Sequence, residues 1–347
     1  MILNKKLNNF DVIRLLAAWM VLYSHSFALY DNSSEISLLS YDSFSGMALN
    51  AFFVISGYLI TGSYIRRANL YVFLFNRMLR LLPGLIVVIL TSILLLGPIL
   101  TNKSIVDYFY DVNTYKYLRG ILIFPLKYSL PGVFENNPYP NIVNGSLWSL
   151  EIEVKCYIAV GALGVMNLLR QNIVLVITGF CLIVYLILDY YAASFSKYIW
   201  IFKYGNLIHG FRWFLSFFLG ASLYLLKDKI PYNYFTFFIV VILDLILWYL
   251  LPLGHYYHIV LMSYLTIYIG LHSSFITKVL NGNDISYGVY IYAFPIQQIY
   301  MHYIGTKFGF VPFVALSTII SFFCGYISWI FVEKPCLYMK RNLKWLN

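Results

Sequence analysis

The chain of 347 residues is 61% hydrophobic and 20% aromatic, and only 11% of its residues are charged. A water-soluble domain carries about a quarter charged residues, so this composition excludes an ordinary soluble fold and predicts an integral membrane protein. The net charge of +10 does not indicate nucleic-acid binding, because the cations stand in short segments between long apolar runs, where they act as topology signals.

Ten apolar segments are long enough to cross a bilayer, which takes roughly 20 helical residues. We expect an all-α, polytopic helix bundle that forms a single membrane domain over residues 1–347, with no appended soluble domain and no cleavable signal peptide. The predicted spans lie near 11–30, 44–65, 78–100, 146–167, 172–191, 208–226, 232–252, 256–273, 284–304 and 309–332.

The distribution of Lys and Arg predicts the orientation of these spans. With the N-terminus inside, 14 of the 24 cations fall in inner segments, 7 in outer segments and three within spans. Because cytoplasmic loops are enriched in Lys and Arg, this asymmetry predicts that both termini face the cytoplasm. The chain is therefore expected to be a multi-pass protein of the cytoplasmic membrane.

The first span carries two ionisable residues on one face. Arg14 and His25 are eleven residues apart, which places them on one stripe of a helix with a rise of about 16 Å between them. Asp11 stands three residues before Arg14 and is expected to orient its guanidinium. Ionisable groups within spans mark functional sites. The alternatives are a snorkelling cation for Arg14 and a helix-bridging core histidine for His25.

The third span opens with a pair of arginines, Arg77 and Arg80, at a spacing that shares one helix face, with Pro83 at the start of the apolar run. Guanidinium groups match phosphate oxygens in geometry, so the pair indicates a polyphosphate site at the cytoplasmic end of the bundle. The alternative is that both serve only as topology signals.

Residues 101–145 form the one long segment between spans, and it is expected outside. It is rich in proline and aromatic residues. Two interpretations stay open: a connector packed over the bundle, or a lid or platform for the acceptor.

The fourth span contains three charged residues within five positions. Glu151 and Lys155 are expected to pair as i,i+4 neighbours, which leaves Glu153 in need of another partner. Glu153 and His25 are predicted at similar depth on antiparallel helices, so we expect a pair in which the carboxylate orients the imidazole as a general base. The alternative is a buried ion pair that only fixes packing.

No metal site is predicted. The remaining histidines lie singly near span ends or, as His255 and His258, in a short outer turn without further ligands. The four cysteines form no CxxC pair and are expected to be free.

Several separated motifs, in order along nearly the whole chain, resemble the membrane acyltransferase-3 family, whose members O-acylate bacterial surface glycans and related molecules. The matching residues are Asp11-x-x-Arg14 followed by His25, NAFFVISGYLI at 50–60, Arg77-x-x-Arg80 with Pro83, SLWSLEIE at 146–153 followed by Tyr157, ISYGVYIYAFP at 285–295, and VEKP at 332–335.

The resemblance implies roles for single residues. His25 would be the catalytic histidine with Arg14 as its partner, and Glu153 the family glutamate, with Trp148 beside it at the substrate. Arg77 and Arg80 would contact the nucleotide or pyrophosphate of acyl-CoA, and Glu333 would be structural. The chain has Ala293 where many members carry a second histidine, so a mechanism that needs that histidine is not expected.

Together these observations predict an enzyme that transfers an acyl group, with acetyl as the expected group, from cytoplasmic acyl-CoA (acetyl-CoA) to a hydroxyl of a lipid-linked or surface polysaccharide. Acyl-CoA is a co-substrate, and no bound cofactor is expected. His25 would either deprotonate the hydroxyl directly or first accept the acyl group. A glycan or small-solute transporter or flippase is the alternative function, and a non-catalytic scaffold is the third. The acyl group, the acceptor hydroxyl and the oligomeric state, a homo-oligomer included, are left open.

Overall fold

The computed structural model describes residues 8–35, 42–123, 126–195, 205–250, 254–280 and 282–339. Within these ranges the regular structure is entirely helical, apart from an isolated antiparallel bridge between Thr101 and Val133. The expected all-α class is thereby confirmed. Some residues considered above lie outside the described residues or have side chains that are not described: Lys5, Lys6, Lys197, Lys203, His209, His255, Lys340, Arg341 and Lys344.

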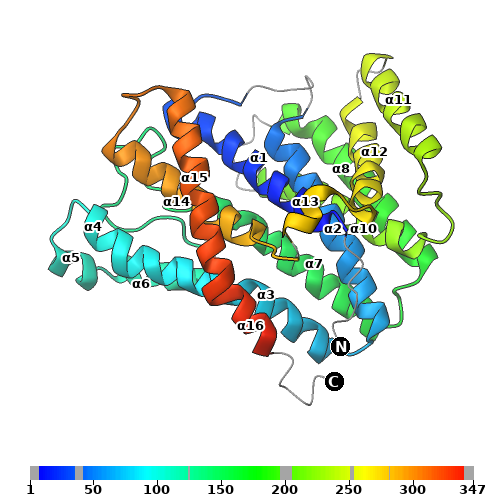
Figure 1. The fold of residues 1–347 in the computed structure, drawn as a ribbon, viewed down its shortest axis with the longest axis horizontal. Helices are drawn as coiled ribbons and strands as arrows, with labels where there is room; N and C mark the ends of the chain where they lie inside the picture. The colour runs from blue at the N-terminus through cyan, green and yellow to red at the C-terminus, as the bar shows by residue number, and fades with distance from the viewer. Residues whose placement is uncertain are drawn as a thin grey trace.

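Figure 1 shows the helices packed as one bundle. They are α1 (Phe10–Asp31), α2 (Phe44–Arg66), α3 (Leu70–Thr91), the π-helix η1 (Ser92–Leu96), α4 (Gly97–Leu100), α5 (Ile105–Tyr110), α6 (Val112–Lys116), the 3₁₀-helices η2 (Tyr117–Leu122) and η3 (Gly145–Leu147), α7 (Trp148–Val165), α8 (Gln171–Phe195), α10 (Gly205–Leu225), α11 (Tyr234–Leu250), α12 (Gly254–Leu271), α13 (Phe275–Leu280), α14 (Ser286–Tyr303), α15 (Phe310–Ser328), the π-helix η4 (Trp329–Glu333) and α16 (Lys334–Met339).

Each of the ten apolar segments contains a helix, and five of the described helical stretches are long and apolar enough to cross a membrane. Two shorter apolar helices, Tyr234–Leu247 and Tyr256–Leu271, accompany them. The chain is therefore a helical membrane protein, while the count of ten spans and the orientation of the termini stay predictions. The five long stretches are Phe10–Asp31, Phe44–Arg66, Leu70–Leu100, Gln171–Tyr190 and Phe310–Met339.

The third helix begins earlier than predicted. It starts at Leu70 rather than near residue 78, because the side chain of Asn69 accepts a hydrogen bond of 3.0 Å from the Val72 amide and caps its first turn. With η1 and α4 the helical stretch continues to Leu100. Arg77 and Arg80 consequently lie in its second and third turns.

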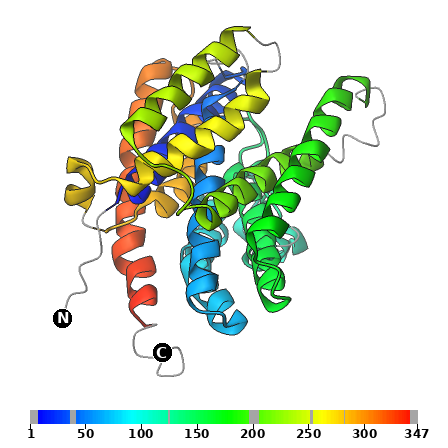
Figure 2. The same ribbon diagram turned by 90° about the vertical axis from the view of Figure 1, so that its right-hand side faces the viewer.

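Helix α2 occupies the centre of the bundle and packs against α1, α7, α10 and α12. Its contact with α10 is a close approach of two backbones, since a Cβ added to Gly57 would meet the Phe217 carbonyl oxygen at 1.8 Å. A Cβ at Gly220 would meet the Val54 carbonyl oxygen at 2.0 Å. Small residues permit such close crossings in membrane bundles. Figure 2 shows α8 and the start of α10 projecting from one side.

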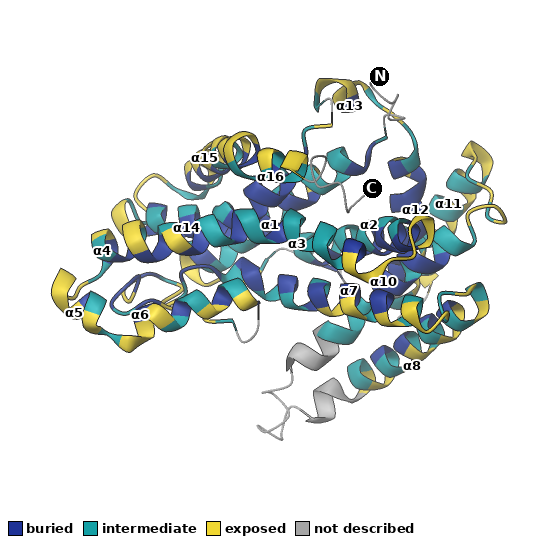
Figure 3. Ribbon diagram, turned by 90° about the horizontal axis from the view of Figure 1, so that it is seen from below, coloured by how far each residue is buried: buried dark blue, intermediate teal, exposed yellow. Residues whose placement is uncertain are grey.

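The segment after α3 folds back along the bundle instead of extending from it. Tyr108 of α5 is fully buried and donates a hydrogen bond of 3.1 Å to the carbonyl of Ile93. The outer face of α5 is not covered by other described helices, and Tyr110 on this helix is 84% exposed. Figure 3 shows exposed residues on α5 and α6 and buried ones on the inner helices. Whether this segment serves as a platform for the acceptor stays a hypothesis.

Candidate active site

A pocket lies between α1, α2, α3, α7 and α14 and encloses a cavity of about 80 Å³. Helix α2 supplies mostly apolar side chains, while the other four helices supply most of the polar groups. Polar and charged side chains that converge on a pocket with an apolar wall are typical of a small-molecule site. The polar residues that line it are Arg14, Ser56, Arg77, Arg80, Ser149, Glu153, Tyr157, Ser286, Tyr287 and Tyr290.

Four of the six site residues predicted from the sequence meet in this pocket. Arg14 comes from α1, Arg77 and Arg80 from α3, and Glu153 from α7. The two arginines of α3 thus do share one face. The other two predicted residues, His25 and Trp148, are not among the residues that line the pocket.

Carboxylates hold two of the three arginines. The NH1 group of Arg14 lies 3.5 Å from Asp11, as predicted, and 3.3 Å from Asp284. Arg80 donates a hydrogen bond to the same oxygen of Asp284. Arg77 makes no ion pair within the described part of the chain: its NH2 group lies 3.5 Å from Ser63 Oγ, and its buried Nε has no hydrogen-bond partner. A guanidinium with spare donors at a pocket wall suits an anionic ligand.

Asp284 was missed by the sequence analysis, which used it only as the edge of a span. It lies in the loop before α14, where its side chain accepts hydrogen bonds from the amide and the hydroxyl of Ser286. The guanidinium groups of Arg80 and Arg14 offset the cost of burying this carboxylate. The sequence signal that could have pointed to it is an Asp followed two residues later by Ser, since an Asp side chain often bonds the backbone two residues on in an Asx turn.

Glu153 lies one and a half turns into α7, beside the pocket. Its Oε1 accepts a hydrogen bond of 3.2 Å from Ser56 Oγ on α2, and a second from the hydroxyl of Tyr157. Among the described residues, none donates a hydrogen bond to its Oε2. The side chain is therefore fixed by two neighbours, with one carboxylate oxygen left uncommitted.

The predicted pair of His25 and Glu153 is not formed. The ring of His25 packs edge-on against Phe294 at 5.3 Å between centroids, and its buried Nδ1 has no hydrogen-bond partner. Phe294 also lies against Gly145, eight residues before Glu153. Eight residues of helix span on the order of 12 Å, so the imidazole and the carboxylate lie at different heights in the bundle. The prediction failed because it estimated both depths from sequence distance alone.

On the side that faces α14, His25 has polar neighbours. Gln297 of α14 is fully buried and donates hydrogen bonds to the Leu22 carbonyl at 3.0 Å and to Ser26 Oγ at 2.7 Å, which ties α14 to α1 on either side of His25. Its Oε1 is buried without a partner, as is the Nδ1 of His25. Two uncommitted polar atoms at one helix interface are suited to a bound polar group.

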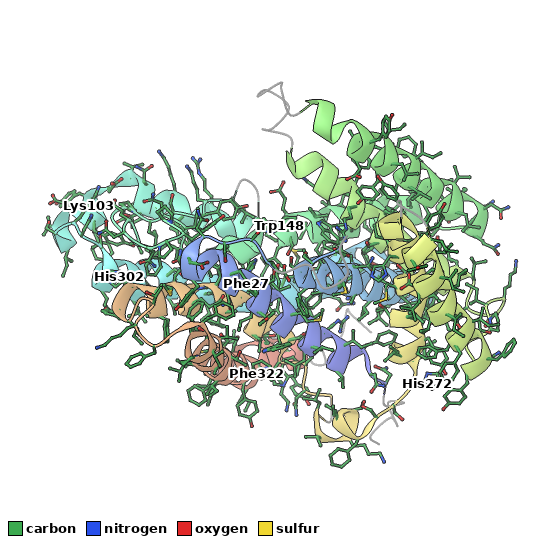
Figure 4. The ribbon with its side chains drawn as sticks, turned by 90° about the horizontal axis from the view of Figure 1, so that it is seen from above. Phe27, Lys103, Trp148, His272, His302 and Phe322 are labelled. Atoms are coloured by element: carbon green, nitrogen blue, oxygen red, sulfur yellow. The ribbon has the colours of Figure 1, made fainter. Side chains whose placement is uncertain are left out.

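Trp148 is the first residue of α7 and packs, half-buried, against the hydrophobic core. In Figure 4 it lies near the middle of the molecule, whereas Lys103 and His302 lie toward one end and His272 toward the other. Its role in substrate binding stays a prediction.

One local prediction is confirmed beside the pocket, and a second residue lies in surroundings that fit its predicted role. Lys155 and Glu151 form an ion pair of 2.8 Å on the outer face of α7. Glu333 is buried at the end of η4 and accepts a hydrogen bond of 2.9 Å from Ser328, which fits a structural role.

The site and its helices define a membrane enzyme with an arginine-lined pocket, and the comparison with known proteins gives its class. Residues 7–330 match the family described as "Acyltransferase domain", so the chain belongs to this family and is an acyltransferase. The resemblance read from the motifs is thereby confirmed, and so is the prediction of an enzyme.

Two curated relatives support this assignment. The chain is 31% identical to "O-acetyl transferase" of Shigella phage Sf6 over 343 residues, which cover 96% of each protein. It is 30% identical to "Nodulation protein 10" of Rhizobium leguminosarum bv. viciae over 165 residues, which cover 44% of this chain and 42% of the relative. No solved structure matches the chain.

Proposed function

We propose that this acyltransferase moves an acyl group, acetyl in the simplest case, from cytoplasmic acyl-CoA to a hydroxyl of a lipid-linked or cell-surface glycan. The relative from Shigella phage Sf6 is an O-acetyl transferase that aligns along almost its full length. The resemblance to enzymes that acylate surface glycans supports the acceptor class. The excess of Lys and Arg on the predicted inner side supports a donor that enters from the cytoplasm of a cytoplasmic-membrane protein.

The observation that carries the donor assignment is the convergence of Arg14, Arg77 and Arg80 on one pocket. Acyl-CoA bears phosphate groups at one end and the thioester at the other. Guanidinium groups bind phosphates through several parallel hydrogen bonds, and their strength increases where water is excluded. Because Arg77 has no carboxylate partner among the described residues, its charge is available to the phosphates.

The chemical step is assigned to His25. Its imidazole would take the proton from the acceptor hydroxyl while that oxygen attacks the thioester carbonyl carbon. The new C–O bond forms as the C–S bond breaks, and the thiolate of CoA leaves and receives the proton from the imidazolium. A rise of about 16 Å separates Arg14 from His25 along α1, so the donor would lie extended, with its phosphates and its thioester at opposite ends.

Transfer of radiolabelled acetyl from acetyl-CoA tests this function. The purified protein in lipid nanodiscs is incubated with labelled acetyl-CoA and a lipid-linked oligosaccharide, and label in the carbohydrate fraction is measured. We expect transfer by the wild type and a loss of at least about 100-fold in His25→Ala, since general-base catalysis contributes this much or more. His302→Ala is the matched control, because His302 is an exposed histidine at the end of α14.

Label released only as free acetate, or no turnover of acetyl-CoA at all, would contradict the proposed function. Equal transfer by wild type and His25→Ala would contradict the assignment of His25 while leaving the acyltransferase reaction in place.

A further inference from the structure

Asp284 joins three parts of the bundle through one carboxylate. Its Oδ2 accepts from Arg14 of α1 at 3.3 Å and from Arg80 of α3, while its Oδ1 accepts from Ser286 at the start of α14. Only 4% of the residue is exposed. The carboxylate is therefore a fixed point to which two guanidinium groups from different helices are attached.

The loop around Asp284 is itself anchored. The side-chain oxygen of the preceding residue, Asn283, accepts hydrogen bonds from Trp329 Nε1 at 3.0 Å and from Lys334 Nζ at 3.1 Å. Both donors stand at the end of the last long helical stretch. The loop is thus held between α14 on one side and η4 and α16 on the other, and Asp284 cannot shift without breaking contacts on both sides.

The two arginines keep donors for a ligand despite this contact. A guanidinium carries five N–H groups, and Asp284 engages one nitrogen of Arg14 and one of Arg80. Both side chains line the pocket. Without the carboxylate, two like charges would face each other where water is scarce, and each long side chain would be free to turn away.

We infer that Asp284 is a positioning residue for the acyl donor: it holds Arg14 and Arg80 together at the pocket wall, in the arrangement that receives the donor's phosphates. The inference rests on the proposed function, because it takes the donor to be a phosphate-bearing thioester. Asp284 itself does not touch the reacting atoms. Its effect should therefore appear in donor binding and depend on the phosphates.

Two donors separate this role from a general structural one. Initial rates are measured in nanodiscs with acetyl-CoA and with S-acetylpantetheine, which has the same thioester and arm but no phosphate. For Asp284→Asn we expect a roughly tenfold or larger rise in the KM of acetyl-CoA, as for loss of a charged hydrogen bond. The kcat at saturating acetyl-CoA should stay near that of the wild type, and kcat/KM for S-acetylpantetheine should change less than twofold.

Two further variants complete the design. Asp284→Glu keeps the charge but displaces it by one methylene, so it should raise the KM of acetyl-CoA less than Asp284→Asn does. Asp244→Asn is the matched control: Asp244 is bonded to His258 at 3.0 Å on α11 and α12, away from the pocket, and its replacement should leave the KM of acetyl-CoA unchanged. If Asp284→Asn does not fold, Asp284→Glu alone tests the inference. The inference then requires that Asp284→Glu raises the KM of acetyl-CoA and leaves kcat/KM for S-acetylpantetheine unchanged.

A lower KM in Asp284→Asn, as expected if the carboxylate competes with the phosphates, would overturn the inference. So would an unchanged KM, or an equal change for both donors. A wild-type enzyme that turns over neither donor would instead overturn the proposed function, and this inference with it.

Discussion

Buried charges occur in two regions of the molecule, and they are arranged differently. Among the described residues of α8, α10, α11 and α12, Arg212 and Asp244 each meet a matched partner. Arg212 lies 2.6 Å from Asp42, the residue shortly before α2, and His258 lies 3.0 Å from Asp244. In the pocket, Arg14 and Arg80 share one carboxylate, Asp284, and Arg14 also lies 3.5 Å from Asp11, while Arg77 makes no ion pair among the described residues.

This difference distinguishes charges that fix packing from charges that await a ligand. A buried pair with matched partners is costly to desolvate but complete in itself, so it orders the helices that carry it. A pocket that contains an arginine without a carboxylate partner, as Arg77 is among the described residues, can still bind an anion. Ionisable groups in a membrane bundle are therefore functional candidates mainly where their charges are unbalanced.

The largest effect should come from breaking a matched pair. Arg212→Gln leaves the Asp42 carboxylate, whose side chain is 4% exposed, without its cation, and we expect a loss of about 3–5 kcal/mol in the free energy of unfolding. Thermal unfolding in detergent measures it. The KM of acetyl-CoA in the folded fraction should be normal; normal stability with a raised KM would reverse the roles of the two regions.

Arg77→Gln should show the opposite pattern. We expect the KM of acetyl-CoA to rise about 10- to 100-fold, as for loss of a hydrogen bond to a charged group, with little change in the unfolding temperature. Steady-state kinetics and a thermal melt of the same preparation decide this. Arg119→Gln in η2 is the matched control, because Arg119 is exposed and away from the pocket. An equal rise in the KM of acetyl-CoA in Arg119→Gln would contradict a specific role of Arg77 in donor binding.

Glu153→Gln should have a smaller effect on activity. The amide keeps an oxygen that accepts from Ser56 and Tyr157, so stability should be preserved, while the negative charge beside the pocket is lost. We expect kcat/KM to fall about tenfold, in line with one charged hydrogen bond. Unchanged kinetics would leave Glu153 as a packing residue.

The smallest effect on activity and stability is expected for Glu151→Gln, two residues before Glu153. Glu151→Gln breaks an ion pair whose side chains are 31% and 44% exposed, and such pairs contribute about 0–1 kcal/mol. Activity and unfolding temperature should both stay close to those of the wild type. Because the change in residue type matches Glu153→Gln, a large loss here would show that charge anywhere on α7 matters.

The sequence predicted well what a single helix determines. Helical spacing alone placed Arg14 beside Asp11 and Lys155 beside Glu151, since residues three and four apart share a face. Apolar run length located a helix in every predicted span. The start of α3 was wrong because the Asn69 cap, a polar signal before the apolar run, was not considered.

Contacts between distant segments could not be obtained in this way. Asp284 reaches Arg14 across 270 positions, and Ser56 reaches Glu153 across 97. The packing of helices decides such contacts, and the height of a residue within a bundle depends on where its helix begins and how it tilts. For this reason the pairing of His25 with Glu153 was wrong, although Arg77 and Arg80 were correctly expected on one face.

The most direct test of the pocket as the donor site is an electron cryomicroscopy structure of the protein in nanodiscs with a non-hydrolysable thioether analogue of acetyl-CoA. We expect density for the phosphates beside Arg77 and Arg80 and for the acyl end toward His25. Density for the analogue among α8, α10, α11 and α12, with the arginine-lined pocket empty, would contradict this assignment.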